Sequence, residues 1–126
     1  MWILRPTARG PEVLLLQRPE RRGGGWHPVT GKGDMGEQVS VTAAREALEE
    51  TGLRGEMEEL GLRHQFGGNK RDFEEHAFWM RVPTGAEPRL SDEHVAHRWA
   101  GPDEALAMVE WPNHRAALAL ALGRWR

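Results

Sequence analysis

The stretch Arg45-Glu46-Ala47-Leu48-Glu49-Glu50-Thr51-Gly52-Leu53 decides how this chain can fold, because it combines a helical pattern with clustered carboxylates. At about 100° per residue, Glu46, Glu49 and Glu50 fall within roughly a 100° arc of one helix face. Gly52 stands where the C-terminal cap of a helix belongs. We therefore predict a helix over residues 38–51 that presents three acidic side chains together.

The opposite side of this predicted helix is apolar. Val41, Ala44 and Leu48 recur at three- and four-residue spacing. Such a stripe is typical of a helix that packs against the rest of a fold. We therefore predict that these three side chains contact a sheet and that the carboxylates point away from it.

Like charges at this spacing destabilise an isolated helix by a few tenths of a kcal/mol per pair. Arg45 can reach Glu49 one turn further on, but this leaves Glu46 and Glu50 facing each other. A hard divalent cation, Mg²⁺ or Mn²⁺, would compensate them, because carboxylate oxygens are the ligands it prefers. The alternative is a solvated acidic helix face with salt bridges between its side chains. The residues that flank the helix, described below, favour the metal site over this alternative.

Apolar runs of strand length surround the acidic helix. They predict strands at residues 2–4, 13–16, 60–66, 73–82 and 95–99, and an extended segment at 26–30. Pro102 and Pro112 stand where helices begin. Because strands and helices do not alternate regularly, the fold class is α+β rather than a doubly wound sheet. The length suits one domain over residues 1–126.

Composition narrows the class of protein further. The chain has no cysteine, which excludes disulfides, thiolate catalysis and Cys-based zinc sites. Its net charge of −2 provides no field that would draw it to nucleic acid. We find no signal peptide and no apolar run of membrane-spanning length, so we expect a cytoplasmic enzyme with neither membrane nor stable nucleic-acid partners. The six histidines form no spaced pair and are predicted to be surface or supporting groups.

Outward from the helix, the chain has Gly31, five residues, Glu37, seven residues and then Arg45. With the stretch quoted first, this resembles the Nudix box over residues 31–53, with all seven fixed Gly, Glu and Arg positions present. Chance agreement at those positions is roughly 10⁻⁶ to 10⁻⁷ per window. The resemblance implies an α/β/α sandwich with a mixed sheet. It also implies a metal-dependent hydrolase that cleaves a pyrophosphate bond in a nucleoside-diphosphate-linked substrate.

The resemblance also implies roles for individual residues. Glu46, Glu49 and Glu50 would ligate Mg²⁺ or Mn²⁺, and the Gly31 carbonyl would reach a metal. Glu37 would support the loop or join the metal shell, and Arg45 would orient Glu49. The general base would be a helix glutamate, Glu49 or Glu50, or Glu93 from a loop.

Three further segments, residues 26–31, 91–99 and 111–115, resemble motifs of the dihydroneopterin triphosphate pyrophosphohydrolase group within this family. That resemblance implies that Glu93 is a further metal ligand or base and that Arg18 and Thr30 contact substrate. It favours hydrolysis of a nucleoside or pterin triphosphate to a monophosphate and pyrophosphate. Three alternatives stay open: a nucleotide-pool sanitiser, a hydrolase of dinucleoside polyphosphates or nucleotide sugars, and a sensor domain that binds nucleotides without cutting them.

Overall fold

The computed structural model describes residues 1–30, 38–68 and 71–126, and within these ranges all side chains except those of 64–68 and 71–74. Gly31 and Glu37 therefore lie outside the described residues. The strands are β1 (Trp2–Thr7), β2 (Gly10–Gln17), β3 (Trp26–His27), β4 (Glu56–Gly68), β5 (Arg71–Arg81) and β6 (Ala96–Ala100). The helices are α1 (Val39–Thr51), α2 (Pro102–Met108) and α3 (Pro112–Arg124), with a 3₁₀ turn at Glu20–Arg22.

Each strand and helix predicted from the sequence is present, with ends that differ by a few residues. The segment predicted to be extended over 26–30 is a strand only at Trp26–His27, and β4 begins four residues before its predicted start. Six strands form one sheet in the order β3-β2-β1-β5-β4, with β6 paired to β2. The β1–β5 pair is parallel and the other pairs are antiparallel, so the sheet is mixed, as predicted.

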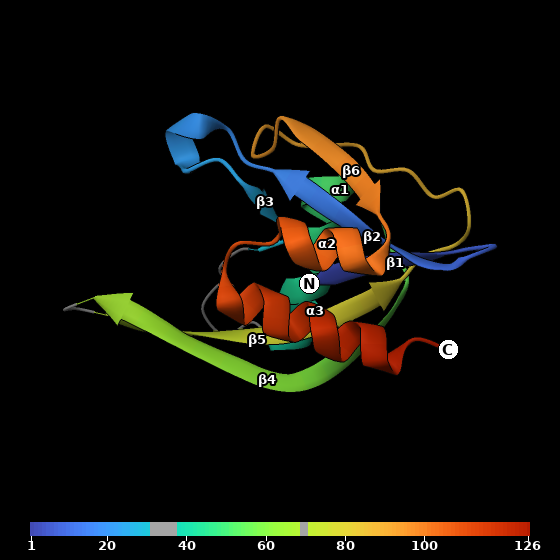
Figure 1. The fold of residues 1–126 in the computed structure, drawn as a ribbon. Helices are drawn as coiled ribbons and strands as arrows, with labels where there is room; N and C mark the ends of the chain where they lie inside the picture. The colour runs from blue at the N-terminus through green and yellow to red at the C-terminus, as the bar shows by residue number, and fades with distance from the viewer. Residues whose placement is uncertain (31–37, 69–70) are drawn as a thin grey trace.

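Both faces of the sheet are covered by helices (Figure 1). Side chains of a strand point alternately to its two faces, and β1 and β2 follow this rule through two apolar clusters. Trp2, Leu4, Val13 and Leu15 join the cluster on the side of α2 and α3. Ile3, Leu14 and Leu16 join the cluster that includes Ala47 of α1. The two layers of helix around the sheet confirm the predicted α/β/α sandwich.

The predicted orientation of α1 is wrong. Val41 and Leu48 are 52% and 38% exposed, whereas Ala47, Glu46 and Glu50 are buried. The apolar stripe and the glutamates lie on opposite sides of the helix, so only one of them can face the sheet. Ala47 is small enough to bring the helix close to the sheet, and Glu46 and Glu50 are buried beside it because they border this contact.

None of the helices in the described part of the chain has the length and apolar character needed to cross a membrane. Gly55, directly before β4, lies close against the backbone of β5. A Cβ atom at Gly55 would lie 2.0 Å from the carbonyl oxygen of Arg81 on β5.

Candidate metal and substrate site

One cleft of about 570 Å³ lies beside α1. Its lining combines the glutamate-bearing face of the helix with residues from two loops, namely Thr30, Arg45, Glu46, Glu49, Glu50, Ser91, Asp92 and Glu93. Six of these were candidate site residues on sequence grounds. The fold therefore brings together residues that are up to 63 positions apart in the chain (93 − 30).

The helix side of the cleft presents its glutamates in two different environments. Glu46 and Glu50 are 9% and 4% exposed, while Glu49 is exposed to solvent. Arg45 donates from Nη1 to both carboxylate oxygens of Glu49 at 3.1 Å, the contact predicted from their spacing. Glu49 is thus held at the mouth of the cleft, and Glu46 and Glu50 lie deeper.

The loop between β5 and β6 brings Glu93 and His94 to the helix through backbone hydrogen bonds. The amide of Arg89 donates to the carbonyl of Thr51 at 2.7 Å, and that of Ser91 donates to the carbonyl of Glu50 at 3.3 Å. The last carbonyls of a helix have no partner within the helix, so the loop satisfies two of them. Hydrogen bonds therefore join α1 and this loop directly beside the cleft.

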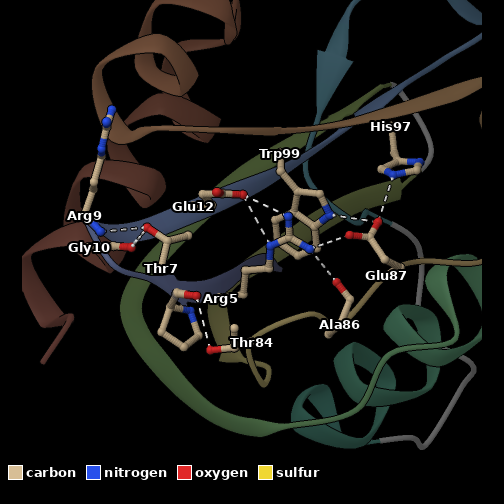
Figure 2. A network of polar contacts seen from close by, with 11 residues as sticks. Arg5, Thr7, Arg9, Gly10, Glu12, Thr84, Ala86, Glu87, His97 and Trp99 are labelled. Carbon is tan, nitrogen blue, oxygen red and sulfur yellow. Dashed lines mark hydrogen bonds and ion pairs between the residues drawn. The ribbon is translucent and has the colours of Figure 1, made fainter.

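The start of the same loop is anchored on the sheet by Arg5 of β1 (Figure 2). Arg5 donates to the carbonyl of Ala86 at 2.8 Å and forms ion pairs with Glu12 and Glu87. Its guanidinium lies 3.9 Å from the ring centroid of Trp99, a cation–π contact. The loop is thus held on the sheet at Ala86 and Glu87 and on the helix at Arg89 and Ser91.

Glu50, Glu93 and His94 form a group of donor atoms that lie within 4.8 Å of one another. Burial, reinforced by the charges of Glu93 and Glu46, raises the pKa of Glu50 to about 8. Burial, with nearby Arg18, lowers the pKa of His94 to about 4, so the imidazole is neutral near pH 7. Carboxylate oxygens and a neutral imidazole are metal ligands.

The buried oxygen Oε1 of Glu50 has no hydrogen-bond partner among the described residues. Buried polar atoms are almost always paired, so an unpaired carboxylate oxygen in an acidic cleft fits the coordination of a cation. The residues present therefore fit a divalent metal ion at this site.

Arg18 extends the cleft on its cationic side. It follows β2 and donates from Nη2 to Thr30 Oγ1 at 2.8 Å. Burial lowers its pKa, while the charge of Glu50 acts in the opposite direction, and a guanidinium stays charged under all ordinary conditions. Arg18 and Thr30 are thus in contact at the rim of the cleft, where the sequence predicted that they meet substrate.

Three aromatic rings, those of Trp111, His114 and His27, lie beside Arg18. The guanidinium carbon is 5.7 Å from the ring centroid of Trp111, which is 48% exposed. Trp111 stacks on His114 with ring centroids 5.3 Å apart, and His27 meets both rings edge-on. His27, His94 and His114 are all buried, so of the two predicted roles, surface or supporting group, the surface role does not apply to these three.

Three residues of the site were not predicted from the sequence. Ser91 and Asp92 line the cleft, and His94 belongs to the donor group. The available signal was that His94 directly follows Glu93 in a segment already singled out. The spacing between histidines does not reveal His94, because one histidine can join carboxylates that come from another element.

The chain belongs to the NUDIX domain family, whose model matches residues 1–121. Its family and its relatives support a hydrolase. It is 39% identical over 119 residues to an octanoyltransferase from Myxococcus xanthus, covering 90% of this chain and 33% of that protein. It is 33% identical over 112 residues to the asymmetrical bis(5'-nucleosyl)-tetraphosphatase of Mus musculus, covering 85% of this chain and 76% of that enzyme.

Solved structures agree with this assignment. A NUDIX hydrolase structure from Listeria monocytogenes superposes with a TM-score of 0.85 at 26% identity, covering 98% of this chain and 89% of that chain. The dihydroneopterin triphosphate pyrophosphohydrolase of E. coli superposes with a TM-score of 0.76 at 21% identity, covering 93% and 89%. The second likeness is one of fold, so resemblance to the pterin group stays a prediction.

Proposed function

We propose that residues 1–126 form one domain that hydrolyses a pyrophosphate bond in a nucleoside polyphosphate, with Mg²⁺ or Mn²⁺ bound at the acidic cleft. The observation that carries the proposal is the buried, unpaired carboxylate oxygen of Glu50 beside Glu93. A bound divalent cation would supply an activated water and neutralise charge on the phosphates. Glu46, Glu50 and Glu93 would hold it, and Glu49 would complete the site from the position that Arg45 gives it.

The positive side of the cleft suits the anionic part of such a substrate. Arg18 is a half-buried cation whose Nη2 is fixed on Thr30, and a guanidinium binds phosphate oxygens through two parallel donors. Trp111 lies directly behind it and is half exposed. An aromatic face of this kind can stack a nucleobase while Arg18 binds the adjoining phosphate.

Dinucleoside tetraphosphates are the first substrates to test. The asymmetrical tetraphosphatase of Mus musculus is a relative of which this chain spans most of the length. A nucleoside or pterin triphosphate is the second candidate, supported by the resemblance of residues 91–99 and 111–115 to the pterin group. A sensor that binds nucleotides without cutting them is disfavoured, because the described part of the box keeps all three helix glutamates.

The test is a hydrolysis assay with dinucleoside tetraphosphates, nucleoside triphosphates and dihydroneopterin triphosphate, each with Mg²⁺, with Mn²⁺ and with EDTA. Products separated by anion-exchange chromatography should include a nucleoside or pterin monophosphate, and EDTA should abolish their release. Glu50→Gln should lower turnover by two orders of magnitude or more. Tight nucleotide binding without any metal-dependent product would reject hydrolysis in favour of the sensor.

A further inference from the structure

The buried pair of His94 and Glu50 is not explained by carboxylate chemistry alone. His94 Nδ1 lies 3.8 Å from Glu50 Oε1, and the two residues are 7% and 4% exposed. Neither atom has a hydrogen-bond partner in the described part of the chain. A buried polar group without a partner is destabilising, so two of them facing each other indicate a shared partner.

The distance between the two atoms indicates what that partner is. A direct N–H···O hydrogen bond spans about 2.7–3.2 Å, and 3.8 Å is too long for one. Two ligands that are each about 2.1 Å from the same cation lie roughly 3.0 Å apart when adjacent and 4.2 Å apart when opposite. The observed separation falls inside that interval.

Glu93 supplies the third donor. Its carboxylate oxygen and the other two donor atoms lie within 4.8 Å of one another. The widest pair would have to close by at most about 0.6 Å to share one cation with ligand distances of about 2.1 Å. Glu93 is exposed and its side chain is free to make such an adjustment, whereas Glu50 and His94 are fixed by burial.

The backbone that carries His94 is held on both sides by hydrogen bonds, and its imidazole is buried. The amide of His94 donates to the carbonyl of Ser91 at 3.4 Å, and the amide of Val95 donates to the carbonyl of Gln17 at 2.9 Å. A ligand that is fixed by its surroundings loses little freedom when it binds a metal. The loop therefore presents a preorganised nitrogen donor to α1.

We propose that His94 is a direct nitrogen ligand, through Nδ1, of a divalent metal ion shared with Glu50 and Glu93. The inference rests on the proposed function in requiring a divalent cation in the cleft, and it specifies the class of that cation. Mg²⁺ prefers oxygen ligands, whereas imidazole suits transition metals. Because His94 adds a nitrogen ligand to the oxygen ligands of the glutamates, the site should bind Mn²⁺ or Co²⁺ more tightly than Mg²⁺.

The test is electron spin-echo envelope modulation on the full chain loaded with Mn²⁺ alone, prepared with natural-abundance or with ¹⁵N-labelled histidine. We expect modulation from a directly bound nitrogen that changes with the label and disappears in His94→Asn. His76→Asn is the matched control, because His76 lies on β5 and contacts Glu59, outside the cleft. The control should keep the nitrogen signal.

Binding constants provide the second measurement, from the EPR signal of free Mn²⁺ and its displacement by Mg²⁺. His94→Asn should weaken Mn²⁺ binding by roughly tenfold or more and change Mg²⁺ binding much less. Mn²⁺ binding without labelled-nitrogen modulation in the wild type would overturn the role of His94, and retained Mg²⁺-dependent hydrolysis would leave the proposed function standing. Binding of neither ion would overturn both. If His94→Asn does not fold, the labelled wild-type protein still decides the question, because His94 is the one histidine of the donor group within the described ranges.

Discussion

The metal-free protein should lose stability through Glu50 as the pH rises, and Glu50→Gln should remove that loss. Burial raises the pKa of Glu50 from its ordinary 4.5 to about 8. Between these values the folded protein holds a proton that the unfolded chain releases. The contribution of Glu50 to stability is therefore complete below pH 4.5 and is lost as the pH rises through 8. For one proton, the free energy of unfolding changes by at most about 1.4 kcal/mol per pH unit. Between pH 6.5 and 8 the wild type should therefore lose about 2 kcal/mol of stability through Glu50.

Urea unfolding in EDTA at pH 6.5 and 8 measures this effect as the difference between Glu50→Gln and the wild type. The difference is needed because other buried groups also titrate. The Met1 amino group, whose pKa burial lowers against the opposing charges of nearby glutamates, is one such group and is present in both proteins. The stability that His94 contributes is lost only as the pH falls from 6.5 toward 4, because its pKa is lowered.

The free energy of unfolding of Glu50→Gln, relative to that of the wild type, should rise by about 2 kcal/mol between pH 6.5 and pH 8. Its dependence on urea concentration should be unchanged. Saturating Mn²⁺ should stabilise the wild type by mass action and stabilise the variant less. A difference between the two proteins that is the same at both pH values would refute the reasoning, because Glu50 would then not hold a proton in the folded state.

Three other substitutions test separate parts of the structure. Glu93→Gln should lower metal-dependent turnover by orders of magnitude, with Glu104→Gln, at an exposed position of α2, as the control. A loss of only twofold would show that Glu93 is not part of the metal site. Arg45→Ala should change the free energy of unfolding by less than about 1 kcal/mol, because its ion pair is exposed, yet reduce kcat; unchanged kcat would exclude its orienting role. Gly55→Ala should destabilise the fold by about 3 kcal/mol or more, because the new methyl group would overlap the backbone of β5. The matched Gly123→Ala in α3, where a Cβ atom meets nothing within 4 Å, should instead stabilise by up to about 1 kcal/mol; equal melting temperatures would contradict the close approach.

The acidic face of α1 could be predicted because it depends only on local geometry. Glu46 and Glu50 are one helical turn apart, and Gly52 does end the helix, with φ 72° and its amide bonded to the carbonyl of Leu48. The sheet order and the pairing of the loop with the helix were not predictable in this way. They depend on contacts between residues far apart in the chain, such as Ser91 and Glu50, which leave no periodic signal.

The face that α1 turns to the sheet shows why a hydrophobic pattern can mislead. Val41 and Leu48 are larger and more apolar than Ala47, so the pattern favours burying them. The helix instead buries Ala47, which is 0% exposed, because a small residue permits close packing and places Glu50 at the cleft. The requirement of the site therefore outweighs the local pattern.

The hydrogen bonds from Arg89 and Ser91 to the end of α1 use main-chain atoms only. A substitution at Arg89 can change side-chain chemistry and keep this contact, provided that the amide hydrogen remains, whereas Ser91 Oγ also accepts a hydrogen bond from the amide of Glu93 at 3.3 Å. Proline would remove that hydrogen, and one residue inserted between Ser91 and Glu93 would carry the carboxylate out of reach of the helix. Variation during evolution, or in a designed library, should accordingly be broad in side-chain type at Arg89 and narrow in the length of this segment.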